Sequence, residues 1–133
     1  MSVNLRVCAA AILVQGIFTG QAEAALYVAP LGPGGTWQVY ETVSSTALWP
    51  DAQAAAQAKT DPLFGTSATG NLIAINSAAE NLFTQRMTRG AGAWWIGGTD
   101  QAVEGEWRWA SDGTQFWQGT ASGSAVGGNY TNW

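Results

Sequence analysis

The chain has 133 residues, of which five are basic, nine are acidic and none is histidine, so its formal net charge is −4. A negative surface repels a phosphate backbone, and we therefore expect no nucleic-acid partner. Cys8 is the single cysteine. Without histidine or a second cysteine, the chain lacks the common ligands of zinc, the usual base that activates a serine, and any internal disulfide.

The first residues have the pattern of a secretory signal peptide. Arg6 gives a positive start, the run at 7–18 is almost wholly apolar, and the AEA sequence at 22–24 matches a small-residue cleavage site. The apolar run is shorter than the roughly 20 residues that a bilayer-spanning helix needs. We therefore predict that residues 1–24 are a cleaved signal peptide, that the protein is secreted (extracellular or periplasmic), and that no segment spans a membrane.

The first half of the remaining chain predicts one strand and one helix. Residues 25–35 are rich in proline and glycine, and we expect little regular structure there. The alternation of β-forming residues at 36–43 predicts the first strand. Residues 49–59 predict a helix, because alanine dominates the segment and Pro50 suits a first helical turn.

The middle of the chain predicts a short buried strand at 71–75 and a second helix at 77–87. Ser77 and Glu80 have the spacing of a capping box, in which each side chain bonds to the backbone at the other end of the first turn. The helical spacing places four residues on one apolar face, namely Ala79, Leu82, Phe83 and Met87.

The last third of the chain is rich in strands, glycine and tryptophan. We predict strands at 93–97, 106–110 and 114–117, a turn at 111–113, and a flexible loop at 118–129. Because helices and strands are segregated and no βαβ repeat occurs, the fold class is α+β. All eight tryptophans follow the leader. They can fill a core or stack on sugar rings, and the sequence leaves both roles open.

Two carboxylates, Asp100 and Glu104, lie four residues apart in a turn bounded by glycines at 97, 98 and 105. Calcium takes about six to eight oxygen ligands, which loop carboxylates and backbone carbonyls supply. The pair therefore indicates either part of a cation site or a solvated acidic turn. A glycosidase would need two carboxyl groups at a fixed separation, which no spacing here establishes, so we expect no enzyme.

Several stretches, taken in order, resemble the C-type lectin-like domain family. They are WPDAQAAAQA at 49–58, GNLIAINSAAENLF at 70–83, WWIGGTDQAVEGEWRWASDG at 94–113 and YTNW at 130–133. Within the third, residues 95–97 match the WIG motif of the family. The resemblance covers residues 36–133 and is similar in style to secreted bacterial members without disulfides.

The resemblance implies a fold of two helices packed on small antiparallel sheets with a long loop region. It implies a secreted carbohydrate-binding module, calcium-assisted in its complete form, whose partners are glycans. The alternative is a calcium-independent module on the same fold that binds a surface protein, as an adhesin does. Asp100 and Glu104 fall on the positions of ligands for auxiliary calcium ions in the family.

The chain departs from the family pattern in two respects. The paired cysteines of the family are absent, which places the domain in a disulfide-free branch. The principal calcium and sugar loop, and the closing strands, would follow Trp133. We therefore expect residues 36–133 to be a domain incomplete at its C-terminus, with the principal ligand-binding residues beyond Trp133. The chain would then be either the front part of a longer lectin-like protein or a truncated gene product.

Overall fold

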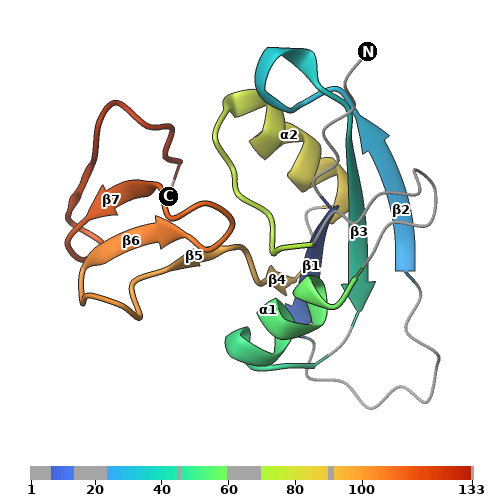
Figure 1. Ribbon diagram of the computed structural model, residues 1–133, viewed down its shortest axis with the longest axis horizontal. Coiled ribbons are helices and arrows are strands. Elements are labelled where there is room, and N and C mark those ends of the chain that lie inside the picture. Colours follow the sequence, from blue (N-terminus) through green and yellow to red (C-terminus); the bar gives the residue numbers. More distant parts are fainter. Residues whose placement is uncertain (1–6, 14–23, 45, 60–69, 90–91, 133) are drawn as a thin grey trace.

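The computed structural model describes residues 7–13, 24–44, 46–59, 70–89 and 92–132. Over these residues it has two α-helices, one short 3-10 helix and eight strands, which form two four-stranded sheets. The orange-to-red second sheet stands beside the first sheet and its helices (Figure 1). The fold is mixed α+β, as predicted.

The first sheet has the strand order β2-β3-β1-β4. Its strands are β1 (Val7–Leu13), β2 (Ala24–Ala29), β3 (Gln38–Ser44) and β4 (Ala93–Trp94). The β2–β3 and β1–β4 pairs are antiparallel, but β1 runs parallel to β3. The first sheet therefore includes one parallel pair, whereas its other pairs are antiparallel. Its strand β1 lies within the predicted leader.

The prediction of little regular structure at 25–35 is wrong for the first part of that segment. Strand β2 pairs with β3 from Ala24 opposite Val43 to Ala29 opposite Gln38. The Leu-Tyr-Val sequence favours a strand, and the glycine-rich part begins only afterwards with the 3-10 helix Pro33–Gly35. The predicted strand at 36–43 is confirmed, since β3 occupies most of it.

Both predicted helices are present. Helix α1 spans Trp49–Gln57 and helix α2 spans Ala78–Met87, with Ser77 as its N-cap. The Ser77 hydroxyl accepts a hydrogen bond from the Glu80 amide at 3.1 Å. The Glu80 carboxylate accepts from the Asn76 amide at 2.6 Å, one residue earlier than a capping box requires. The helix start is therefore confirmed: the first-turn amide of Glu80 has a hydrogen-bond partner, and so does the amide just before the cap.

The predicted apolar face of α2 is only partly correct. Ala79 and Leu82 are exposed, whereas the buried residues are Glu80, Thr84 and Met87. Polar side chains tolerate burial when they have hydrogen-bond partners. The Glu80 carboxylate caps the helix, and the Thr84 hydroxyl donates to the Glu80 carbonyl at 2.8 Å. Helical spacing alone could not reveal these internal partners.

The helices cover opposite faces of the first sheet. Tyr40 of β3 packs against Phe83 of α2, with ring centroids 5.0 Å apart. The next residue, Glu41, points to the other face and forms an ion pair of 2.7 Å with Lys59, just after α1. Helix α1 also lies next to β1. Strand β3 is therefore enclosed on both faces.

The segment 71–75 is buried as predicted, but it is not a strand of either sheet. Gln53 of α1 holds it, since its amide nitrogen donates to Asn71 and its oxygen accepts from the Leu72 amide, both at 3.1 Å. The Ile73 carbonyl accepts from the Gly97 amide at 2.8 Å. The backbone of this segment is thus satisfied by a helix side chain and a connector, in place of a strand ladder.

The second sheet has the order β5-β6-β7-β8, with each neighbouring pair antiparallel. Its strands are β5 (Gly98–Thr99), β6 (Glu106–Trp109), β7 (Gln115–Gln118) and β8 (Ser124–Ala125). The predicted strand at 93–97 is correct only for β4 at its start; residues 95–97 are a connector between the sheets, and β5 follows them. The predicted loop at 118–129 contains β8.

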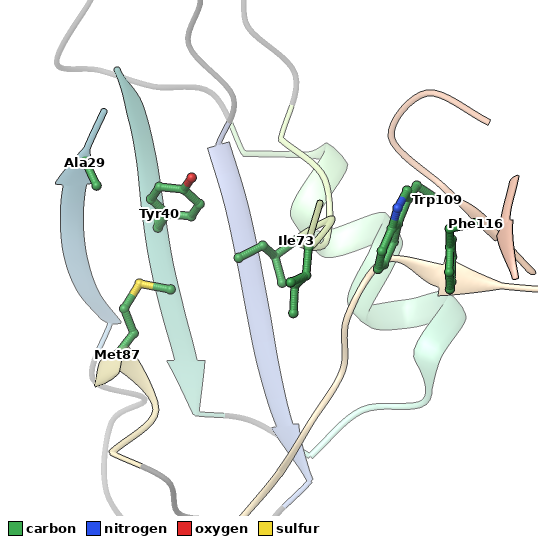
Figure 2. Packing of buried hydrophobic residues seen from close by; sticks show 7 residues of the cluster. Ala29, Tyr40, Ile73, Met87, Trp109 and Phe116 are labelled. Atoms are coloured by element: carbon green, nitrogen blue, oxygen red, sulfur yellow. The ribbon is translucent and has the colours of Figure 1, made fainter. Parts of the chain in front are cut away.

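One hydrophobic cluster joins the two sheets. In Figure 2, Ile73 lies between Tyr40 of the first sheet and the stacked Trp109 and Phe116 of the second. The buried members of this cluster are Ala29, Tyr40, Ile73, Ile75, Met87, Trp109 and Phe116. A smaller cluster packs Ala52 and Ala56 of α1 against Leu72. The second sheet is therefore seated on the core of the first.

Candidate functional site: the loop-rich second sheet

The connector 95–97 enters the second sheet from a position fixed on α1. The Trp95 indole nitrogen donates to the Ala47 carbonyl at 2.8 Å, and the Trp49 indole nitrogen donates to the Ile96 carbonyl at 2.8 Å. These reciprocal hydrogen bonds tie the start of α1 to the connector. The hydrogen bonds of Trp49 and Trp95 therefore fix the position from which the second sheet begins.

Gly97 is the junction of three segments. Its amide donates to the Ile73 carbonyl and its carbonyl accepts from the Ala110 amide, each at 2.8 Å. A Cβ atom at this position would lie 2.7 Å from the Leu72 carbonyl oxygen, closer than real side chains come. The WIG motif therefore needs a glycine at position 97, because the backbone of Leu72 comes too close for any side chain.

The turn that carries the predicted metal ligands closes on itself. One Asp100 carboxylate oxygen accepts from the Gly105 amide at 3.2 Å, and the Thr99 hydroxyl accepts from the Gln101 amide at 3.2 Å. Gly105 has φ 79°, a left-handed conformation that favours glycine. Asp100 therefore has a structural role in this turn, whether or not an ion binds there.

The two predicted calcium ligands differ in exposure. Asp100 is half-buried and Glu104 is exposed. No group of three or more histidine, cysteine or acidic residues able to hold a metal occurs in the part of the chain that the structure describes. Two carboxylates supply only part of the roughly six to eight oxygens of a calcium shell, so the remaining ligands would be backbone carbonyls and water.

A set of polar side chains covers the exposed face of β6 and β7. We call Glu106, Arg108, Gln115 and Gln118 the β6–β7 polar face. The Arg108 guanidinium donates to Glu106 at 3.0 Å and to Gln115 at 3.3 Å. The Gln115 amide nitrogen in turn donates to the Gln118 side chain at 2.7 Å. Each member thus orients the next.

A β-bulge creates this polar face. Trp107 lies opposite Trp117, and Arg108 lies opposite Gln115, so Phe116 is an extra residue in β7. The bulge brings Gln115 and Gln118 to the side of Arg108, while Phe116 stacks on Trp109 at 4.0 Å. Sequence reasoning missed this face. The signal was the failure of TQFWQ to alternate as EWRW does.

The segment after β7 is tied to the sheet. The indole nitrogens of Trp107 and Trp117 donate to the carbonyls of Gly119 and Thr120, at 3.2 and 2.9 Å. The Asn129 side-chain amide donates to the Gln115 carbonyl at 2.8 Å. The predicted flexible loop is therefore hydrogen-bonded to the strands that carry the polar face.

The structure assigns most described tryptophans to the scaffold. Trp109 is 1% exposed, and the four indoles that donate to carbonyls are half-buried. Trp37, which is 50% exposed, is an aromatic side chain open enough to stack on a ligand. It precedes β3 and lies outside the second sheet. The core role is thus confirmed for Trp109, and no stacking role is assigned on the polar face.

Comparison with known proteins gives one partial likeness. The chain is 35% identical over 114 residues to halomucin of Haloquadratum walsbyi, in a match that covers 77% of this chain and 1% of halomucin. The chain thus spans about 1% of the length of this relative. No protein-family profile matches the chain. No solved structure matches it.

The prediction that no segment spans a membrane can be compared with the structure only over the described residues. Neither helix in the described ranges is both long and apolar enough to cross a bilayer.

Proposed function

We propose that the protein is a secreted carbohydrate-binding module of the C-type lectin-like class, and that the β6–β7 polar face contacts the sugar in addition to the principal ligand-binding residues expected beyond Trp133. The observation that carries this proposal is the composition of that face. It offers a carboxylate acceptor in Glu106, a five-donor guanidinium in Arg108, and two amides that both donate and accept. Sugar hydroxyls are donors and acceptors at once, so a mixed set of this kind suits them.

The position of the face supports the proposal. The side chains orient one another, and the strands beneath them are tied down by indole hydrogen bonds. Polar groups held in place before binding lose less conformational freedom when a ligand arrives. The ordered sequence resemblance, from the first helix to the WIG motif, independently favours the lectin-like class.

The calcium-assisted part of the proposal rests on Asp100 and Glu104. These residues would hold an ion at the turn that leads into β6, next to the polar face along the chain. Bound calcium would supply positive charge there, together with coordination positions for further oxygen ligands. The chain's own contribution is the turn closed by Asp100 and Gly105, which keeps the carboxylate in place.

The proposal is tested by retention on immobilised mono- and oligosaccharides. We expect the protein to be retained, and Arg108→Ala and Gln118→Ala to abolish retention while the protein remains folded. Arg86→Gln is the matched control, because Arg86 is exposed on α2, away from the polar face. Loss of retention in the control, or full retention in both polar-face variants, would contradict the assignment.

A protein-binding module is the second candidate, and one observation favours it. Leu26 and Val28 of the edge strand β2 are 57% and 46% exposed and point to the same side. Exposed apolar residues in an edge strand mark a surface suited to protein contacts. Binding to protein-coated surfaces that survives a calcium chelator, and that Leu26→Lys abolishes, would favour this function over glycan binding.

A further inference from the structure

The strand register extends the β6–β7 polar face onto β8. Residues directly opposite each other in an antiparallel pair point to the same face of a sheet. Gln118 lies opposite Glu106 on one side and opposite Ser124 of β8 on the other. These three residues form a first row, which crosses β6, β7 and β8. Ser124 is exposed, and its hydroxyl has no hydrogen-bond partner among the residues that the structure describes.

A second row lies beside the first and extends the face in the other direction. Arg108 lies opposite Gln115 of β7 and opposite Thr99 of β5. The Thr99 hydroxyl oxygen accepts from the Gln101 amide, so its hydrogen remains available for donation. Thr99 and Ser124 therefore add one hydroxyl group at each edge of the sheet.

The two rows together reach all four strands of the second sheet. Neighbouring strands lie about 4.8 Å apart, so each row spans about 10 Å and the two together span about 14 Å across the strands. A single sugar ring is shorter than either row. A monosaccharide would therefore contact only part of the rows, whereas a chain of sugar units lying across the strands would contact residues on each of them.

The charge of this region disfavours acidic ligands. Residues 92–132 contain one basic and four acidic residues, so their net charge is 1 − 4 = −3; the residues are Arg108, Asp100, Glu104, Glu106 and Asp112. The positive charge of Arg108 is already paired with Glu106 at 3.0 Å. The rows therefore offer an anionic sugar no unpaired cation, and the surrounding carboxylates repel it.

We propose that the two rows form a binding surface for an uncharged oligosaccharide of several units, with Thr99 and Ser124 as contact residues at its two edges. This inference rests on the proposed function and names the ligand class of the same face. The sugar chain lies across the strands. Each further unit adds hydrogen bonds until the rows are covered, so affinity grows with chain length.

The test is calorimetric titration of the full chain with sugar ladders, each running from the monosaccharide to the hexasaccharide. Glucose, mannose and N-acetylglucosamine ladders are the uncharged probes, and a galacturonic acid ladder is the acidic probe, all in one calcium-containing buffer. We expect an uncharged ladder to bind, with a dissociation constant that falls about tenfold from the monosaccharide to the trisaccharide and then levels off. The acidic ladder should bind more weakly at every length.

Substitutions at the two edges test the extent of the surface. Ser124→Ala and Thr99→Val should each weaken hexasaccharide binding about threefold to tenfold, because each removes one hydroxyl contact. A monosaccharide cannot respond to both, because the two residues lie on opposite edge strands. Ser122→Ala is the matched control, since Ser122 is equally exposed but precedes β8 and its hydroxyl is hydrogen-bonded to that of Thr120.

The outcomes separate this inference from the proposed function. Equal affinity for the monosaccharide and the hexasaccharide, or tighter binding of the acidic ladder, would overturn the inference and leave sugar binding in place. Unchanged hexasaccharide affinity in Ser124→Ala, or an equal loss in Ser122→Ala, would do the same. If no saccharide binds at any length, the proposed function is contradicted and the inference with it.

Discussion

The two sheets have the same number of strands, but they are stabilised by different means. The first sheet has two strands of seven residues and one of six, and helix side chains pack on β3. The second has strands of two or four residues. There, indole nitrogens bonded to backbone carbonyls and a stacked Trp109–Phe116 pair replace long ladders. The comparison shows that a loop-rich region can be fixed by a few side-chain hydrogen bonds at its ends.

The largest effect is expected at Gly97, where the two regions meet. Gly97→Ala places a Cβ atom against the Leu72 carbonyl oxygen, which is backbone and cannot move aside easily. Overpacking of a core typically costs about 1–3 kcal/mol, and we expect the upper end of that range here. Chemical denaturation would measure the loss.

Gly113→Ala is the control for that substitution. Gly113 has φ 74°, and a Cβ atom added there would meet no atom within 4 Å apart from those of its two chain neighbours. Only the left-handed backbone is therefore penalised, by about 1 kcal/mol. If Gly97→Ala and Gly113→Ala lower the stability equally, the close approach of the Leu72 carbonyl to Gly97 adds no cost of its own.

The next effect concerns the reciprocal indole bonds. Trp49→Phe and Trp95→Phe each remove one donor to a carbonyl and keep an aromatic ring. Each should cost about 1–2 kcal/mol, because a partly buried carbonyl loses its partner. Since both bonds tie the same two segments, the double variant should lose less than the sum of the single losses. If denaturation shows that the stability loss of the double variant equals the sum of the two single losses, the two hydrogen bonds do not act together in joining these segments.

A smaller effect, confined to the first region, is expected at the cap of α2. Ser77→Ala removes the hydroxyl that accepts from the Glu80 amide, and it should lower stability by about 1 kcal/mol. Ser77→Asp keeps an acceptor at this position and serves as the control. Hydrogen exchange should show faster opening of α2 but unchanged protection in β6 and β7. An unchanged denaturation midpoint for Ser77→Ala would refute the role of the cap.

The smallest effect is the response of the acidic turn to calcium. An ion held by Asp100 and Glu104 with few other protein ligands would bind at about the millimolar level of weak extracellular sites. Millimolar calcium should raise the melting temperature slightly by mass action, and Asp100→Asn/Glu104→Gln should abolish the rise. Asp51→Asn, in the exposed first turn of α1, is the control. A full calcium response in the double variant would exclude the turn as the site.

The same contrast explains what could be predicted from the sequence. The start of α2 was predictable because a cap is a local pattern of Ser77 and Glu80. The buried face of α2 was not, because Thr84 is satisfied by a carbonyl one turn away. Strand β2 was missed since the glycines that follow it dominated the segment. The bulge at Phe116 depends on strand register, so the polar face could not be predicted from the pattern of residues alone.

The central claim is that the β6–β7 polar face binds sugar. Its most direct test is an NMR titration of the protein with the saccharide that retains it, following the side-chain resonances of Arg108, Gln115 and Gln118. The account predicts that these signals shift together and saturably, while the indole signals of Trp49 and Trp95 stay in place. Shifts confined to Leu26 and Val28 of β2, or no saturable shift at the polar face, would contradict it.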